Sequence, residues 1–142
     1  MPSPQDIYGA IQQWTASEVG FTGGVWFGEE PERKQLPYCV MVDNGFTADF
    51  QFESQSIDTG NIVLQVFAEN SDSANSLGAE LRDLYGPADS HIAIPTDGTF
   101  KFISIYPGSP YQQVIEPDPD NVGSRVYQYS LTLNIQIARS YG

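Results

Sequence analysis

Nucleophilic catalysis in this chain would depend on its only histidine, His91, or its only cysteine, Cys39. Ser-His-Asp and Cys-His mechanisms both use a histidine as general base. His91 lies in an Asp-Ser-His-Ile segment that lacks the glycine pattern of a nucleophile elbow. Cys39 lies within an apolar run and is predicted to be a small core residue. We therefore expect His91 at the entrance of a strand, and we expect no nucleophilic enzyme site.

Acidic residues offer the next possible chemistry, because two carboxylates can hydrolyse glycosides. The chain has 18 Asp and Glu residues, and no spacing among them selects a pair. Asp118, Asp120 and Gly123 are similar to the start of a calcium loop, but Val122 occupies the next ligand position and no glutamate closes the loop. Zinc would need more cysteine and histidine than the chain supplies. The sequence predicts no metal, no cofactor and an exposed acidic loop at Glu116, Asp118 and Asp120.

Net charge separates this chain from proteins that grip nucleic acid. It carries 18 acidic and 6 basic residues, a net charge of −12, and the basic residues are scattered along the sequence. Binding to phosphates needs a concentrated positive patch. No apolar stretch is long enough to cross a bilayer or to act as a signal peptide. We expect a soluble protein that has no tight nucleic-acid binding and no membrane binding.

Two helices are predicted within a single domain, residues 1–142, a length that suits one domain. The first begins at Ser3-Pro4, a cap followed by proline at the first helical position, and fades by Gly20. Its apolar residues recur at helical spacing: Ile7, Ala10, Ile11 and Trp14. The second covers 73–85, with caps offered by residues 71–73, and Gly86-Pro87 ends it.

Strands are predicted at 25–27, 36–42, 46–52, 62–68, 100–106, 112–116 and 126–139. Asn44-Gly45 is a strong tight-turn signal, so the strands on either side of it are expected to form a hairpin. A further turn is expected at 58–61. This order predicts an α+β fold, with a mostly antiparallel sheet, two helices packed on one face and an extended hairpin.

The closing strand indicates an interaction surface. Its apolar residues alternate with uncharged polar ones from Tyr127 to Ile137. A strand that faces solvent usually carries charges that discourage pairing with other sheets, so this polar face is predicted to meet another protein. The predicted subunit interface combines that face with the return arm of the hairpin: Gln128, Ser130, Thr132 and Asn134 with Phe46, Phe50 and Phe52. Four further aromatics near element ends are also candidates for interfaces: Trp26, Tyr106, Tyr111 and Tyr141.

The order of the elements can be compared with known families. It runs from the helix with Ile7, Ile11 and Trp14 to the strand 37–42, then to a strand 62–68 that leads directly into helix 73–85. It closes with the strand from Arg125 to Arg139. This order resembles the tail-terminator proteins of long-tailed bacteriophages, in the group related to lambda-like terminators and head–tail joining proteins. The resemblance spans nearly the full chain and lies in the order of the elements rather than in a motif.

The resemblance implies a structural virion protein rather than an enzyme. It implies a homo-oligomeric ring, usually a hexamer, on the head-proximal end of the tail tube, where it ends tube polymerisation and joins the tail to the neck. Its partners would be the tail tube protein and the neck or connector proteins. Its location would be the tail–neck junction of the virion, and the host cytoplasm during assembly. An acidic ring would let DNA pass without sticking.

Two alternatives stay open from the sequence. A neck or connector subunit of the same assembly fits the pattern equally well. A carbohydrate- or protein-binding module is the rival class, which an exposed aromatic row on a free monomer would favour. Residues 87–123, rich in proline and glycine, are more elaborate than the minimal terminator pattern.

Overall fold

The computed structural model describes residues 4–28, 35–52, 55–96, 100–108, 111–115 and 126–140, with the backbone alone at 4–6, 48–52, 55, 111–115 and 140. These residues form an α+β fold, which confirms the expected fold class. Its elements are α1 (Pro4–Glu18), β1 (Val25–Phe27), β2 (Tyr38–Phe52), β3 (Gln55–Ala68), α2 (Ser71–Tyr85), the 3-10 turn η1 (Ser90–Ala93), β4 (Phe100–Pro107), β5 (Tyr111–Ile115) and β6 (Val126–Ser140).

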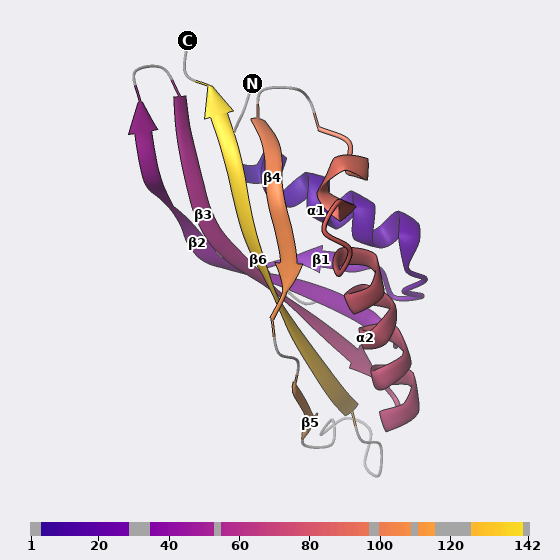
Figure 1. The fold of residues 1–142 in the computed structure, drawn as a ribbon. Helices are drawn as coiled ribbons and strands as arrows, with labels where there is room; N and C mark the ends of the chain where they lie inside the picture. Colours follow the sequence, from indigo (N-terminus) through magenta and orange to yellow (C-terminus); the bar gives the residue numbers. More distant parts are fainter. Residues whose placement is uncertain are drawn as a thin grey trace.

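The strands form one sheet in the order β1-β2-β3-β6-β4, and β5 also pairs with β6. β1 runs parallel to β2, and the other neighbouring strands are antiparallel. β4 pairs with residues 133–139 of β6 and β5 with residues 126–130, so the two short strands lie end to end along one edge of β6. The long strands β2, β3 and β6 run side by side through a strongly twisted sheet (Figure 1).

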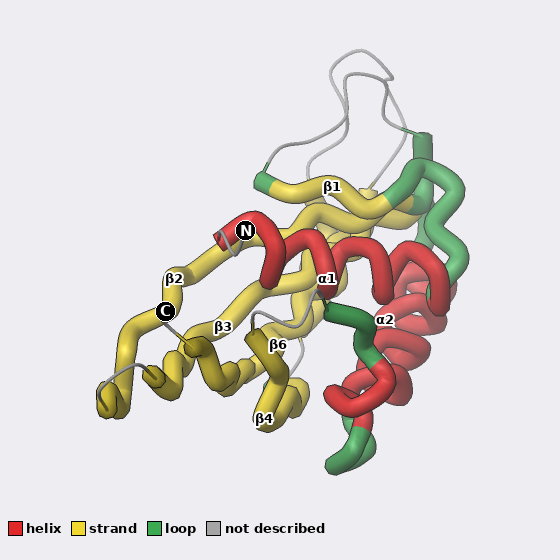
Figure 2. Tube along the Cα trace, turned by 90° about the horizontal axis from the view of Figure 1, so that it is seen from above, coloured by secondary structure: helices red, strands yellow, loops and turns green. Residues whose placement is uncertain are grey.

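Both helices lie on the same side of the sheet, as Figures 1 and 2 show. α2 buries the face that carries Ala74, Gly78, Leu81 and Tyr85. Fully buried residues of α1, Ile7 and Ile11, join the same core. Alternate residues of the long strands complete it, and the largest of them are Met41, Ile62, Leu64, Leu131, Leu133, Ile135 and Ile137. The predicted period-two and helical patterns therefore place the core correctly.

The N-terminus of α2 is capped by Asn70, whose Oδ1 accepts a hydrogen bond from the Ser73 N–H at 2.8 Å. The predicted caps at residues 71–73 are therefore wrong. Asn70 has the extended backbone that a capping residue needs, whereas residues 71–73 already belong to the first turn. No helix in the described part of the chain is both long and apolar enough to span a membrane.

The predicted turn at Asn44-Gly45 is a bulge inside a continuous strand. β2 runs from Tyr38 to Phe52, and its register against β3 shifts between Asp43, opposite Ile62, and Phe46, opposite Gly60. Gly45 has a φ of +93°, and the Asn-Gly signal correctly predicted a positive φ here. A bulge and a tight turn both use positive φ, so the local signal does not distinguish them.

The predicted turn at 58–61 is also wrong, because β3 continues through it. Each of these residues pairs with β6 on the other side, from Asp58 opposite Ile137 to Asn61 opposite Asn134. Gly60 is present because of a close approach: a Cβ atom at this position would lie 2.6 Å from Cγ of Phe46. The extended hairpin therefore consists of the full lengths of β2 and β3.

Candidate interaction surfaces

The two residues that could carry nucleophilic chemistry lie in different elements, Cys39 in β2 and His91 in η1. Cys39 is fully buried in the core, and burial raises the pKa of its thiol far above the usual value. His91 lies half-buried in η1, so its predicted place at a strand entrance is wrong. Across the described ranges, no three His, Cys, Asp or Glu residues come together as a metal site.

The polar face of the closing strand lies on the side of the sheet away from the helices, but part of it is buried within the chain. Gln128 and Ser130 are 7% and 3% exposed, and the Gln128 amide donates a hydrogen bond to the Ser130 hydroxyl at 3.2 Å. These two residues therefore cannot supply the exposed interface that their pattern predicts. Thr132 and Asn134 remain half-buried and accessible.

A second apolar cluster lies at this end of the face. Tyr38, Val40 and Phe67 are buried on the same side as Gln128, and the rings of Tyr38 and Phe67 stack with centroids 4.8 Å apart. Val126 packs against the cluster. Strand alternation predicts which residues share a face, but not which part of that face other residues cover.

The remaining part of the helix-free face is nearly uncharged. Strand register places three hydroxyl or amide residues of β2 and β3 on it, Thr47, Thr59 and Asn61, and three of β6, Thr132, Asn134 and Gln136. Lys101 of β4, opposite Ala138, is the one charged side chain described on this face. We call this surface the open face.

The phenylalanine arm of the predicted interface is only partly described. Phe46 is half-buried against its own core, and its ring contacts that of Tyr8 edge-on at 6.0 Å. Phe50 and Phe52 lie on β2 opposite Ile57 and Gln55, and their side chains lie outside the described residues. So do the acidic loop residues Glu116, Asp118 and Asp120, and the aromatic side chains of Tyr111 and Tyr141.

An ion pair that the sequence analysis did not predict lies on the helix side of the sheet. Nε of Arg139 lies 3.3 Å from Oδ2 of Asp58, with both side chains largely buried. The Ser56 hydroxyl donates a hydrogen bond to the other Asp58 oxygen at 3.0 Å. The contact at Nε does not have hydrogen-bond geometry, so the attraction between the two side chains is mainly electrostatic. Only tertiary structure joins these distant positions.

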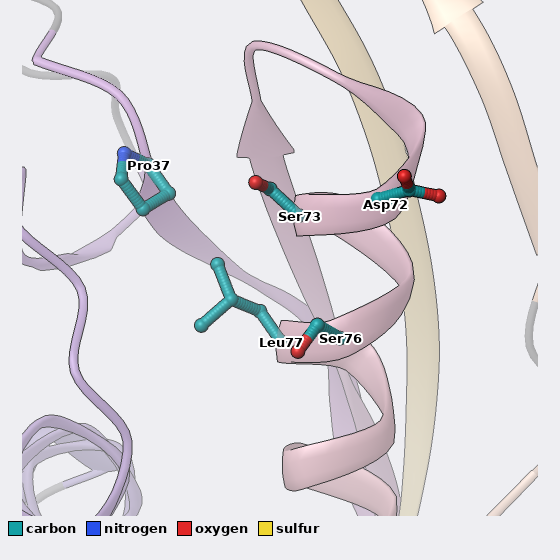
Figure 3. Close-up of a pocket in the computed structure, with 5 residues that line it drawn as sticks. All are labelled: Pro37, Asp72, Ser73, Ser76 and Leu77. Atoms are coloured by element: carbon teal, nitrogen blue, oxygen red, sulfur yellow. The ribbon is translucent and has the colours of Figure 1, made fainter.

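A shallow hollow lies beside the first turns of α2. It encloses about 460 Å³ between the start of the helix and the residue that precedes β2. Figure 3 shows Leu77 and Ser73 directed toward Pro37, whereas Asp72 points away. The Asn70 cap already satisfies the helix N-terminus and Asp72 brings negative charge, so this hollow is unsuited to an anion.

A larger groove of about 540 Å³ lies between α2 and the end of β4. Its lining includes Arg82, Asp83, Tyr106 and Pro107. Arg82 also contacts the hydroxyl of Tyr129, where its charge opposes the rise in pKa that burial causes. The groove holds one cation and one carboxylate, whereas strand register places Tyr106 opposite Asn134, on the side of the sheet away from the helices.

Large apolar side chains are exposed at two places among the described residues. Trp26 and Phe27 lie on β1, and their exposed fractions are 39% and 37%. Tyr106 of β4 is 58% exposed and Ile92 of η1 is 74% exposed. The sequence identified Trp26 and Tyr106 from their places near element ends. It missed Phe27 and Ile92, since no local pattern distinguishes them from core residues.

Comparison with known proteins supports the fold and goes no further. No protein-family model matches this chain, and no curated protein matches it. Several solved structures match, and one of them superposes with a TM-score of 0.50 at 17% sequence identity over 96% of this chain and 97% of that one. At this identity the likeness shows a shared fold over nearly the whole length, without showing a shared function.

Proposed function

We propose that this protein is a structural subunit of a bacteriophage virion. In this proposal, copies form a ring, most simply of six, on the head-proximal end of the tail tube, end its polymerisation and join the tail to the neck. The support is the terminator-like order of elements along nearly the whole chain. A neck or connector subunit of the same assembly is the closest alternative.

The open face is the observation that carries the proposal. It extends across β2, β3 and β6, has no helix over it, and combines polar uncharged residues with partly buried Val63 and Ile57, with Lys101 as its one described charge. In a ring with this face inward, passing DNA would meet no cluster of cations that could hold its phosphates. The net charge of −12 adds a repulsion that acts at longer range.

The proposal predicts weak binding of duplex DNA by the isolated protein. Its affinity for duplex at physiological salt should be weaker than the about 10⁻⁴–10⁻⁶ M of ordinary non-specific binding. Replacing Thr132→Lys and Gln136→Lys places two more cations on the face of Lys101, and this variant should gain salt-sensitive binding. A tight, salt-sensitive shift of duplex by the unmodified protein would contradict the proposed role of the open face.

Particle imaging tests the location. Removing the gene should give tails of uncontrolled length or tails that do not join heads, and labelled protein should lie at the tail–neck junction. Normal tails without the protein, or label elsewhere on the particle, would overturn the terminator role.

A binding module is the second candidate, and the groove beside Tyr106 favours it. Tyr106 is 58% exposed, and Arg82 and Asp83 line a groove at the same end of β4, so this region could contact a sugar or a peptide. Isolated monomers decorating a particle surface, together with loss of ligand capture on Tyr106→Ala, would support this alternative over a ring subunit.

A further inference from the structure

The sheet has two open edges whose strands run in opposite directions. β1 pairs with β2 only at Cys39–Met41, and no described residue pairs with the outer side of β2 from Val42 to Phe52. Within the described ranges, the outer side of β4 is also unpaired. Because β2 and β6 are both antiparallel to β3, and β4 is antiparallel to β6, β2 and β4 point in opposite directions, as their arrows show in Figure 1.

The two open edges also lie at the same level across the sheet. At one end the register aligns Asp43, Ile62, Leu133 and Pro107, and at the other end it aligns Gln51, Ser56, Arg139 and Phe100. Between them it aligns Thr47, Thr59, Gln136 and Ser104 on the open face. A rotation about an axis along the strands preserves their direction. It would therefore bring β2 of one copy beside β4 of the next. The two strands would be antiparallel, with residues of the same level opposite one another.

Among the side chains that the structure describes, the large exposed apolar ones divide evenly between the two sides of the sheet. Trp26 and Phe27 lie on β1, beside the start of the open stretch of β2. Tyr106 lies on β4, and Ile92 lies on η1, which packs against β4. Unlike surfaces on two sides of one subunit are what a head-to-tail contact requires, whereas a two-fold dimer uses one surface twice.

Charge also differs between the two sides. The exposed cations of the described residues, Arg82 and Lys101, both lie on the β4 side. Exposed Asp43 begins the open stretch of β2, at the level of Pro107, which lines the same groove as Arg82. A head-to-tail contact therefore brings Asp43 of one copy toward Arg82 of the next. Arg82 shares its groove with Asp83, so the contact offers Asp43 a cation without making the groove net positive.

Both edges are irregular, and this restricts what can pair with them. The β2 edge has register shifts between Asp43 and Phe46 and between Ala48 and Phe50, and β4 has one between Phe102 and Ser104. Bulges of this kind are a common protection against pairing with arbitrary strands. The two edges run in opposite directions and span the same levels of the sheet, so each offers the other a strand of compatible direction and extent.

We propose that two copies of this chain join head to tail, with the Asp43–Gln51 edge of β2 pairing antiparallel with β4 of a neighbour. The β1 side, with Trp26 and Phe27, then lies against the side that carries Ile92, Tyr106 and the Arg82 groove. This inference deepens the proposed ring by naming the contact between its subunits, and it can be tested without a phage particle.

Paired cysteines test the register directly. In a Cys39→Ala background, Thr47→Cys and Ser104→Cys proteins are mixed at high concentration and oxidised. Residues directly opposite on antiparallel strands have Cβ atoms about 4.5–5.5 Å apart, close enough for a disulfide after a small shift. The mixture should give a linked dimer of one copy of each, and the double variant should give a ladder of higher oligomers. The matched control pairs Thr47→Cys with Lys101→Cys, which the register places level with Phe50; this pair should link several-fold less.

A second pair of variants tests the two side surfaces without assuming which residues of β2 and β4 lie opposite one another. Trp26→Asp alters the β1 side, and Ile92→Asp with Tyr106→Asp alters the β4 side, where both residues are largely exposed. Circular dichroism and melting temperature establish that each variant is folded. Each should fail to self-associate, whereas an equimolar mixture should form a 1:1 dimer through the one unaltered pair of surfaces, measured by native mass spectrometry.

Other results of the cysteine experiment would contradict the contact, and imaging separates the contact from the terminator role. Thr47→Cys linking to itself, or Ser104→Cys to itself, would mean that like edges meet and would overturn the head-to-tail arrangement. Absence of any linked dimer at high concentration would overturn the edge contact, and it would leave β4 open to an extended peptide from another protein. If the cysteines link as expected but imaging finds the protein away from the tail–neck junction, the contact stands and the terminator role fails.

Discussion

Gly78 of α2 lies directly against the aromatic ring of Tyr129 in β6, so close that a methyl group at position 78 would overlap the ring. The contact holds α2 against β6, and Arg82, one turn further along the helix, interacts with the hydroxyl of the same tyrosine. Both residues are buried. The glycine is therefore required by packing between the helix and the sheet rather than by backbone conformation.

Replacing Gly78→Ala should lower the free energy of unfolding by about 1–2 kcal/mol. Overpacking costs about 1–3 kcal/mol, and the better helix propensity of alanine recovers up to about 1 kcal/mol of it. Urea unfolding at pH 7 measures the change. Gly9→Ala in α1 is the matched control, because a Cβ there meets no atom within 4 Å, and it should stabilise by about 0.5–1 kcal/mol. Equal effects at both positions would contradict the packing role of Gly78.

Removing one partner of the Arg139–Asp58 pair should lower the free energy of unfolding. Arg139→Met removes the cation beside a largely buried carboxylate, which keeps the Ser56 hydroxyl as a hydrogen-bond donor, and the free energy of unfolding in urea should fall by about 2–3 kcal/mol. Asp58→Leu with Arg139→Met removes both charges and should recover part of that loss. A double variant whose loss equals the sum of the single losses would show that the two side chains are not coupled.

The hydrogen bond between the Thr15 and Tyr85 hydroxyls, 2.7 Å long, joins α1 to α2 in the core. Both residues are fully buried, so Tyr85→Phe leaves the Thr15 hydroxyl without this partner. The free energy of unfolding, measured in urea at pH 7, should fall by about 1–2 kcal/mol. Adding Thr15→Val to Tyr85→Phe should lower the free energy of unfolding by less than Tyr85→Phe alone does, because the unpaired hydroxyl is then removed. Tyr106→Phe, which alters an exposed hydroxyl, should change stability by less than about 0.5 kcal/mol.

Stability should fall at alkaline pH. Burial raises the pKa of Cys39 and of Tyr85 above their usual values, so both groups keep their protons in the folded protein and lose them on unfolding. Their contribution is present in full below the unfolded pKa values of about 8.5 and 10 and decreases above them, by up to about 1.4 kcal/mol per pH unit for each group. Urea unfolding from pH 8 to 11 should show this decline. Tyr85→Phe should make it less steep above pH 10, and an unchanged slope would contradict the assignment.

Gly60 provides a test of the bulged hairpin. Gly60→Ala places a Cβ 2.6 Å from Cγ of Phe46 and even closer to the carbonyl oxygen of Gly45, so the bulge must shift. A loss of about 1–3 kcal/mol in unfolding free energy is expected. Phe46→Leu in the same protein should recover part of it, because a smaller side chain relieves one of the two contacts. A neutral Gly60→Ala would mean that the hairpin has no close approach at this point.

The sequence predicted the fold class because local periodicity carries that information. The spacing of the leucines in α2 and the alternation in β6 are properties of neighbouring residues, and the alternation places the core side of β6 correctly. In α2 only Leu81 of the leucines is fully buried, because the buried face runs through Ala74, Gly78 and Tyr85 and leaves Leu77 and Leu84 partly buried beside it. Positive φ at Gly45 was also predicted from Asn-Gly alone. A bulge differs from a turn only in whether the strands continue to pair beyond it. That depends on β3 and β6, which are distant in sequence.

Burial and contact between distant positions were decided by the tertiary structure. Gln128 and Ser130 have the same pattern as Thr132 and Asn134, yet only the first two lie beside the Tyr38 and Phe67 cluster and are buried. Arg139 meets Asp58, and β2 comes level with β4, only because β3 and β6 pair along their full length. Alternation determines which face of a strand a residue occupies. The pairing of distant strands determines what lies on that face and which edges remain open.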